Sequence, residues 1–190
     1  MSDFFDLVRS QRAHRAFTDE PVDDATVERL LTAATFAPSA ENSQPWEFVV
    51  VRDETVRSEI GDLMARAWAA ARDYSESRLE QGLFEQVDHG IMARGIASAP
   101  VLIVVGVDTT RVHPKAIGSS VFPAVQNLLL GATALGLGSA LTTIATVYGE
   151  ELRALLGMPA SFAALAVVPI GHPAQVLGPP RRDPPTVHRR

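Results

Sequence analysis

Two polar segments in the first quarter of the chain have residue types that suit an anionic, aromatic ligand. Arg9, Arg12 and Arg15 recur at every third position, and the planar guanidinium group donates the paired hydrogen bonds that bind a phosphate well. Residues 38–45 then combine hydroxyl groups, amides and turn-forming residues in one loop, which could contact the polar edge of a ring. On its own, the arginine spacing also fits a solvated helix face, because charge runs usually lie in solvent.

Other kinds of catalytic site find little support in the sequence. The chain has no cysteine, which excludes thiolate nucleophiles, iron–sulfur clusters and cysteine-based zinc sites. No two of the five histidines have metal-ligand spacing, so we expect no metal. A serine nucleophile elbow and a P-loop are both missing, and Gly136-Leu137-Gly138 lacks the third glycine of a dinucleotide fingerprint. Redox chemistry in such a chain would need an organic cofactor.

The charge distribution argues against nucleic-acid and membrane partners. A net charge of −5 gives no general attraction for nucleic acid. Residues 116–149 contain no Asp, Glu, Lys or Arg and are long enough to cross a bilayer, but Gln126, Asn127 and several glycines interrupt them. We therefore expect a globular protein without a membrane span, and the N-terminal residues, which lack the apolar stretch of a signal peptide, favour a cytoplasmic location.

The elements that must position the polar segments are many helices and few strands. Hydrophobic spacing predicts a helix over residues 2–17, capped by Ser2, and a second that begins at Asp23 or Asp24 and ends before Pro38. Strands are expected at residues 46–51, 101–107 and 163–171, with a strand or extended loop at 139–145. Further helices are expected at residues 54–72, 120–135 and 149–156, with a mostly helical excursion at 72–95. This order indicates an α+β or α/β fold.

The order of these motifs resembles that of the nitroreductase family. The resemblance lies mainly in a Pro-Ser-x-x-Asn-x-Gln-Pro-Trp string that follows an arginine-rich segment at a fixed distance. It extends over nearly the whole chain and is weakest at about residues 66–97. The matching segments are residues 11–17, 21–22, 37–50, 126–128, 136–139, 157–159, 171–173 and 181–182.

The resemblance implies a fold and an assembly. The fold is α+β, with a central mixed, mainly antiparallel sheet flanked by helices, in an intertwined homodimer. Residues 1–190 would form a single FMN-binding domain, with a variable helical excursion at about residues 66–97. The uncharged helix would then pair with its copy in the second chain, although it also fits the centre of one chain's core.

The resemblance also implies which residues contact the flavin. Arg12 is similar to a phosphate or ribityl contact, Arg15 to the cation near the flavin N1 and O2 edge, and Arg181 and Arg182 to a closing phosphate clamp. Pro38 and Ser39 would come from the partner chain. Two departures stand out, since the family often has arginine at Gln11 and serine at Ala13, and losing them weakens the phosphate grip. The full set of expected cofactor contacts is Gln11, Arg12, Ala13, Arg15, Pro38, Ser39, Asn42, Gln44, Thr142, Thr143, Ile144, Arg181 and Arg182.

The implied activity is electron transfer from NAD(P)H through FMN to a nitroaromatic, a quinone or a related small-molecule acceptor. We expect no catalytic acid, base or nucleophile, because the cofactor carries the reactive atoms and the protein supplies position and electrostatics. Arg15 would stabilise the negative charge that builds on the reduced ring. Two alternatives stay open: a protein that sequesters FMN without turnover, and a family member with different flavin chemistry, such as dehalogenation, dehydrogenation or flavin fragmentation.

Overall fold

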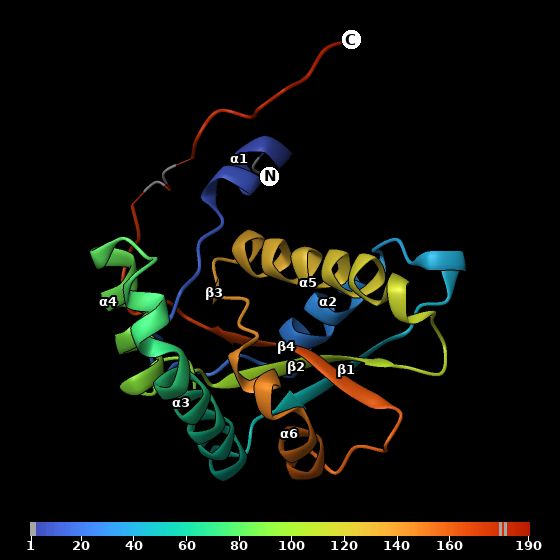
Figure 1. Ribbon diagram of the computed structural model, residues 1–190, viewed down its shortest axis with the longest axis horizontal. Coiled ribbons are helices and arrows are strands. Elements are labelled where there is room, and N and C mark those ends of the chain that lie inside the picture. Colours follow the sequence, from blue (N-terminus) through green and yellow to red (C-terminus); the bar gives the residue numbers. More distant parts are fainter. Residues whose placement is uncertain (1–2, 179, 181) are drawn as a thin grey trace.

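The computed structural model describes residues 3–178, 180 and 182–190. Four strands form one antiparallel sheet in the order β1-β2-β4-β3 (Figure 1). The strands are β1 (Trp46–Val51), β2 (Val101–Asp108), β3 (Gly138–Ser139) and β4 (Phe162–Gly171). The α-helices are α1 (Phe4–Ser10), α2 (Asp24–Thr35), α3 (Glu54–Glu76), α4 (Gln81–Met92), α5 (Ile117–Ala134) and α6 (Gly149–Leu155), and short 3₁₀ turns lie at Ala40–Asn42, Pro114–Ala116 and Ile144–Tyr148.

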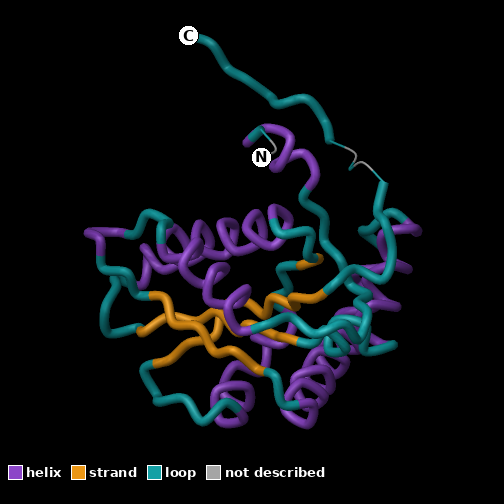
Figure 2. Tube along the Cα trace, turned by 180° about the vertical axis from the view of Figure 1, so that it is seen from behind, coloured by secondary structure: helices purple, strands orange, loops and turns teal. Residues whose placement is uncertain are grey.

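The central strand β2 separates two hydrophobic cores. Its side chains alternate between the two faces of the sheet: Ile103 and Val105 join the core under α2 and α5, whereas Leu102 and Val104 join the core under α3, α4 and α6. Figure 2 shows helices on both sides of the strands. This two-sided burial explains the unbroken apolar run in the sequence. The helices on both faces and the antiparallel pairing of the strands confirm the predicted α+β fold with a mainly antiparallel sheet.

Several elements lie where the sequence predicts them. Strand β1 covers residues 46–51 as expected, and Asp23 caps α2 by accepting a hydrogen bond from the Thr26 amide at 2.7 Å. Helix α5 ends at Ala134, and Gly136, just past the C-cap residue Leu135, has a φ of 73° that suits glycine. Strand β2 extends one residue past its predicted end, to Asp108, and α3 extends four residues past Arg72, to Glu76. No helix in the described ranges is long and apolar enough to cross a membrane.

The predicted first helix is wrong over its second half. Helix α1 ends at Ser10 instead of Phe17, and the following residues are extended. The backbone of Ala13 forms a parallel bridge with Ser139, and Phe17 forms an antiparallel bridge with Pro173, so long-range pairing replaces the local helix. Asp3 occupies the N-cap position, without a side-chain hydrogen bond; the predicted cap Ser2 lies outside the described residues.

The uncharged helix α5 begins three residues earlier than predicted. Ser120 therefore lies inside the helix, fully buried, where its hydroxyl oxygen accepts a hydrogen bond from the Ala40 amide at 3.1 Å. One face of α5 packs on α2 and β2 within the same chain. The opposite face carries the exposed Phe122, Gln126 and Ser119, so α5 is a core helix on one side only.

Candidate functional site

The extended residues 11–17 cross the C-terminal end of α5. The His14 amide donates a hydrogen bond to the Ser139 carbonyl at 2.9 Å. Gly138 allows this approach, because a Cβ atom there would lie 3.0 Å from the Cβ and Cγ atoms of His14. The segment is thereby fixed to the edge of the sheet. Arg12 and Arg15 lie on an extended backbone instead of a helix, whereas Arg9 is exposed on α1.

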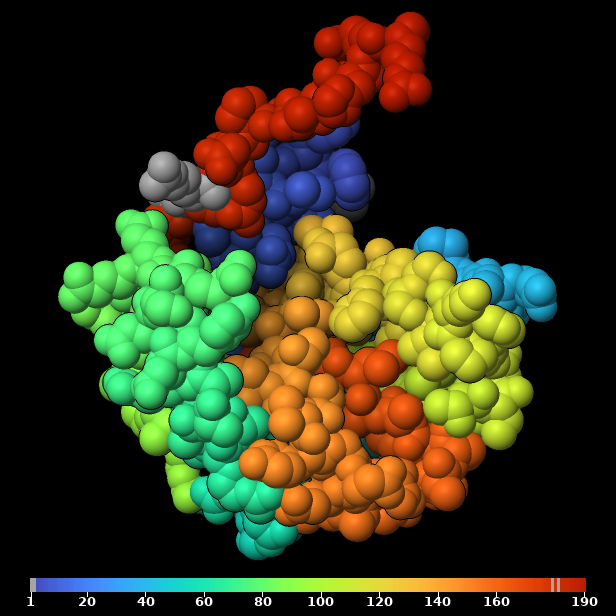
Figure 3. Space-filling view, viewed as in Figure 1, coloured from blue at the N-terminus to red at the C-terminus, as the bar shows by residue number. Residues whose placement is uncertain are grey.

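A cleft of about 500 Å³ brings one half of the predicted site together. It lies between residues 11–15, helix α4 and the C-terminal tail. Figure 3 shows the red tail running beside the blue N-terminal segment, with the green α3–α4 region next to them. The predicted contacts that line it are Gln11, Arg12, Ala13, Arg15 and Arg182. The predicted Arg181 lies outside the described residues.

Arg12 is held in place by backbone carbonyls. Its Nε donates to the Gly178 carbonyl at 2.8 Å, and its Nη1 donates to the carbonyls of Arg9 and Gln11, both at 2.6 Å. These bonds tie the tail to the end of α1 and fix the guanidinium plane. The two Nη2 protons form no hydrogen bond within the described residues, so Arg12 presents an oriented donor edge to the cleft.

Among the described residues, Arg15 has more unused hydrogen-bonding capacity than Arg12. Its side chain is half-buried, and burial lowers the pKa of its guanidinium below the usual value. It donates one long hydrogen bond, to the Ala13 carbonyl at 3.4 Å, and forms no ion pair with any described residue. A partly desolvated cation of this kind is costly unless an anion or acceptor approaches it.

The loop that follows α2 forms the second half of the predicted site. Glu41, Asn42 and Gln44 have positive φ angles of 55°, 53° and 46°. The Ser39 hydroxyl oxygen accepts from the Gln44 amide at 3.0 Å, and the Asn42 side chain accepts from the Gln44 side chain at 3.2 Å. Positive φ at non-glycine residues is uncommon, and such strain concentrates at functional sites.

Within one chain the two halves lie at opposite ends of α5, as Figure 1 shows. The loop is fixed at the helix's N-terminal part through Ser120, whereas Ala13 meets Ser139 just past its C-terminal end. The helix rises 1.5 Å per residue, so about 20 Å separates these points. A single copy therefore does not bring Pro38, Ser39, Asn42 and Gln44 to the arginine cleft.

The third predicted segment, residues 142–144, runs beside β4. Thr142 and Val167 exchange backbone hydrogen bonds at 3.1 and 2.8 Å. The Ile144 amide donates to the Thr142 hydroxyl at 3.3 Å. Thr143 between them is exposed, and its amide donates to no acceptor in the described ranges.

Helix α4 contributes residues to the cleft that the sequence did not single out. Leu83 and Gln86 line it. The predicted excursion has no motif of its own, and only its helical periodicity could have indicated which residues face inward.

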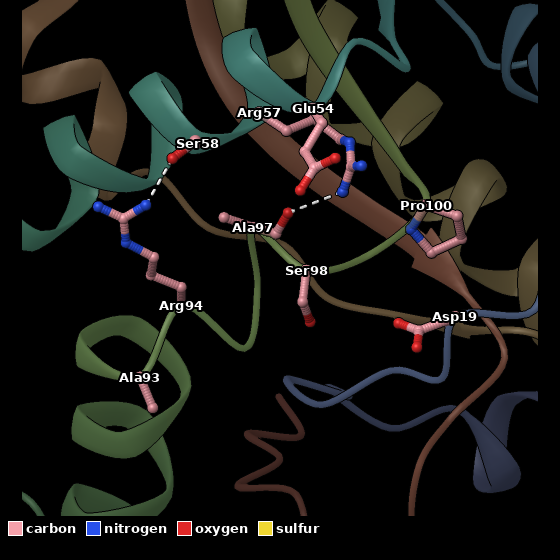
Figure 4. A pocket seen from close by; sticks show the side chains of 9 residues that line it. All are labelled: Asp19, Glu54, Arg57, Ser58, Ala93, Arg94, Ala97, Ser98 and Pro100. Atoms are coloured by element: carbon pink, nitrogen blue, oxygen red, sulfur yellow. Dashed lines mark hydrogen bonds between the residues drawn. The ribbon is translucent and has the colours of Figure 1, made fainter.

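A separate pocket of about 400 Å³ contains two further arginines (Figure 4). Arg57 donates to the carbonyls of Ala97 and Ala99 at 3.1 and 2.7 Å. Arg94 pairs with Ser58 and Asp62. Both cations are used structurally, so this pocket is a weaker anion site than the cleft at Arg15. The described residues contain no cluster of side chains able to hold a metal.

Comparison with known proteins identifies the family to which this chain belongs. The model of the nitroreductase family matches residues 8–172. The chain belongs to this family and is a nitroreductase-family oxidoreductase, as its motifs predict.

Individual relatives differ in the chemistry that their names describe. The 5,6-dimethylbenzimidazole synthase of Rhodospirillum rubrum is 32% identical over 178 residues, which cover 89% of this chain and 81% of the relative. A protein of Archaeoglobus fulgidus, provisionally named an NADH dehydrogenase/NAD(P)H nitroreductase, is 29% identical over 178 residues. The match covers 91% of this chain and 87% of the relative. The structure of an oxidised iodotyrosine deiodinase with bound FMN and 3-iodo-L-tyrosine has a TM-score of 0.80 at 26% identity, with 98% of both chains covered.

Proposed function

We propose that this protein binds FMN in the arginine cleft and passes electrons from NAD(P)H to a small-molecule acceptor, such as a nitroaromatic or a quinone. The observation that carries the proposal is the half-buried Arg15, whose guanidinium makes one long hydrogen bond to the described residues, beside a cleft that Arg12 and Arg182 also line. The relatives' names support the choice of ligand and reductant, since one structure contains FMN and one name includes NAD(P)H.

The cleft suits the phosphate end of such a cofactor. Arg12 has an oriented donor edge, and Arg182 lies on the same cleft. Gln11 replaces a cation with an amide and Ala13 offers no hydroxyl, so the phosphate would depend mainly on Arg12 and the tail. Charge-assisted hydrogen bonds are the stronger kind, which makes these arginines the main determinants of retention.

The ring end would lie between Arg15 and residues 142–144. FMN, when bound, supplies hydride and electron transfer. Arg15 would place a fixed positive charge where negative charge builds on reduction, by the logic of an oxyanion hole. The Thr143 amide, which has no acceptor within the described residues, offers a donor without requiring a particular side chain. This fits a cleft whose described lining includes no carboxylate or histidine.

The remaining contacts would come from a second copy of the chain. The loop with Pro38, Ser39, Asn42 and Gln44 is anchored at Ser120, about 20 Å along α5 from the end where Ala13 meets Ser139. Exposed apolar side chains on α1, Phe4 at 61% and Phe5 at 63%, indicate a surface that another chain covers. In a symmetric homodimer each loop would reach the other chain's cleft.

The spectrum and turnover of the purified protein test the proposal. We expect a yellow protein whose flavin absorbance bleaches with NADPH or NADH without oxygen, and steady oxidation of the nucleotide with menadione or nitrofurazone. Colourless protein that takes up no added FMN would contradict it. Stoichiometric FMN without nucleotide oxidation would favour the sequestering alternative instead.

A second candidate keeps the flavin and changes the acceptor chemistry. It is favoured by the relatives named as a 5,6-dimethylbenzimidazole synthase and an iodotyrosine deiodinase. Aerobic incubation of the reduced protein with excess FMN, and anaerobic incubation with 3-iodo-L-tyrosine, would separate the two. Formation of dimethylbenzimidazole or of tyrosine identifies the respective chemistry, whereas faster turnover with quinone supports the first candidate.

A further inference from the structure

Helix α4 lies unusually close to Arg15. A Cβ atom at Gly90 would lie 2.7 Å from the Arg15 Cβ, 2.9 Å from its Cδ and 3.3 Å from its Cγ. These atoms form the stem of the side chain, whose near end cannot swing away as a flexible tip would. The Arg15 side chain therefore lies along the helix surface in a space that only glycine leaves open.

A second glycine of the same segment meets the backbone of Arg15. A Cβ at Gly95 would collide with the Arg15 carbonyl oxygen. The intervening turn is fixed by a hydrogen bond from the Ile96 amide to the Gly90 carbonyl at 2.9 Å. Arg15 is thus held from two directions by the C-terminal part of the excursion, side chain against Gly90 and main chain against Gly95.

Helix α4 is itself anchored firmly enough to act as a support. Asp88 accepts hydrogen bonds from the Trp68 Nε1 at 2.7 Å and from the Arg72 Nε at 2.8 Å, both on α3. The rings of Trp68 and Phe84 lie 6.0 Å apart in the buried core between the two helices. A collision between α4 and Arg15 would consequently displace the Arg15 side chain and leave α4 in place.

We infer that Gly90 is a positioning residue for Arg15, and that helix α4 thereby sets the reduction potential of the flavin. This inference rests on the proposed FMN site. It gives the helical excursion a role in the proposed flavin site. A methyl group at Gly90 displaces the Arg15 stem, which changes the distance between the cation and the reduced ring and therefore the electrostatic stabilisation of that ring.

The variant Gly90→Ala tests this inference, with Gly82→Ala as the matched control. Gly82 lies on the same helix, and a Cβ there would meet nothing within 4 Å. In FMN-loaded protein we expect Gly90→Ala to shift the midpoint potential by about 30 mV, which is a tenfold change in the two-electron equilibrium. Gly82→Ala should leave the potential at the wild-type value, and Arg15→Ala should lower it by more than the shift that Gly90→Ala causes.

The outcomes separate this inference from the proposed function. Wild-type protein that takes up no FMN overturns both. FMN-loaded protein in which Arg15→Ala lowers the potential while Gly90→Ala matches Gly82→Ala overturns the role of Gly90 alone. If Gly90→Ala fails to fold, the double variant Gly90→Ala/Arg15→Gly tests the contact between the two residues in protein without flavin. Removing the Arg15 side chain removes the collision. Recovery of cooperative thermal unfolding in the apo double variant supports the contact, and an unfolded double variant refutes it.

Discussion

At the level of single residues, Arg12 and Arg15 differ in what already binds them. Arg12 donates three hydrogen bonds, to the carbonyls of Gly178, Arg9 and Gln11, so its side chain is held in place before a ligand binds. Within the described part of the chain, Arg15 has one hydrogen bond of 3.4 Å and packs against Gly90, so it gains more from a ligand than Arg12 does. The same residue type, three positions apart, is thus suited to two tasks, holding a phosphate and stabilising developing charge.

This division predicts opposite effects of two substitutions. Arg15→Ala should lower the midpoint potential of bound FMN more than it weakens binding, because the cation acts on the reduced state. Arg182→Ala should weaken FMN retention, by roughly tenfold for one charge-assisted hydrogen bond, with little change in potential. Spectroelectrochemistry and FMN titration of the apo proteins measure both quantities. An unchanged potential in Arg15→Ala would remove the proposed role.

Ser120 supports the strained loop from inside α5. It is fully buried and accepts from the Ala40 amide at 3.1 Å, so Ser120→Ala leaves that amide without its acceptor. We expect a loss of about 1–2 kcal/mol in the free energy of unfolding, measured by urea denaturation. Ser119→Ala is the control, since the exposed Ser119 hydroxyl donates a hydrogen bond to the Ala116 carbonyl one helical turn earlier and does not support the loop. Equal stability of the two variants would contradict this view of Ser120.

Asp88 gives the stability of the α3–α4 contact a pH dependence. The hydrogen bond from Arg72, and then that from Trp68, hold the pKa of the Asp88 carboxyl below its ordinary value of 3.8. Because the folded pKa is depressed, the stabilisation is present above pH 4 and is lost as the pH falls through the folded pKa. Wild type should therefore unfold at a higher temperature than Asp88→Asn at pH 7, and this advantage should shrink below roughly pH 4. A difference in melting temperature that does not change with pH would exclude an ionic contribution.

The sequence predicted residues of the site better than their surroundings. Gln11, Arg12, Ala13, Arg15 and Arg182 do share one cleft, although whether they bind flavin stays a prediction. Local spacing could not show that Arg12 would be tied to Gly178, because that contact joins positions far apart in the chain. Nor could local spacing show that the Arg15 side chain packs against Gly90, since a single glycine in a helix gives no pattern that predicts its neighbours.

At the level of elements, the pairing of β2 with β4 depends on a glycine at the bulge. The register shifts between Val105 and Gly106, and a Cβ at Gly106 would collide with the ring of Phe162. Gly106→Ala should therefore cost about 1–3 kcal/mol of stability by overpacking. Phe162→Leu in the same chain should recover part of it, as measured by chemical denaturation. Additive losses in the double variant would show that the two residues do not interact.

Element positions were predictable where local pattern and burial agree. Examples are the apolar runs that became β1 and β2 and the Asp23 cap of α2, which lie where their local sequence predicts them. The first helix was overextended because residues 11–17 have helical spacing but pair with Ser139 and Pro173 instead. The start of α5 was misplaced for a related reason: Ser120 resembles a cap, yet its hydroxyl serves the Ala40 amide from inside the helix.

At the level of the whole molecule, the divided site predicts complementation between chains. A variant with Arg15→Ala and a variant with Asn42→Ala each impair every site of their own homodimer if the loop comes from the partner. After co-expression with two different tags and isolation of the mixed dimer, one site should contain both substitutions and the other neither. We expect the mixed dimer to recover about half of the wild-type turnover per dimer.

The controls are the two parent homodimers and a sedimentation measurement of mass. A mixed dimer no more active than its parents would place both residues in the same chain's site, and a monomeric wild type would contradict the shared site altogether. The double variant Phe4→Ser/Phe5→Ser should be more monomeric than the wild type. Removing the two exposed rings leaves less apolar surface to bury between the chains.

The sheet order also constrains how the chain folds. Val104 of β2 pairs with Val49, 55 positions earlier, and with Val167, 63 positions later. Such distant partners make folding slow, because long loops must close before the pairing stabilises them. During synthesis β2 lacks one neighbour until β4 has left the ribosome. Until then its apolar edge is open to other chains, so translation that stalls between residues 108 and 162 should yield aggregates instead of a shorter folded protein.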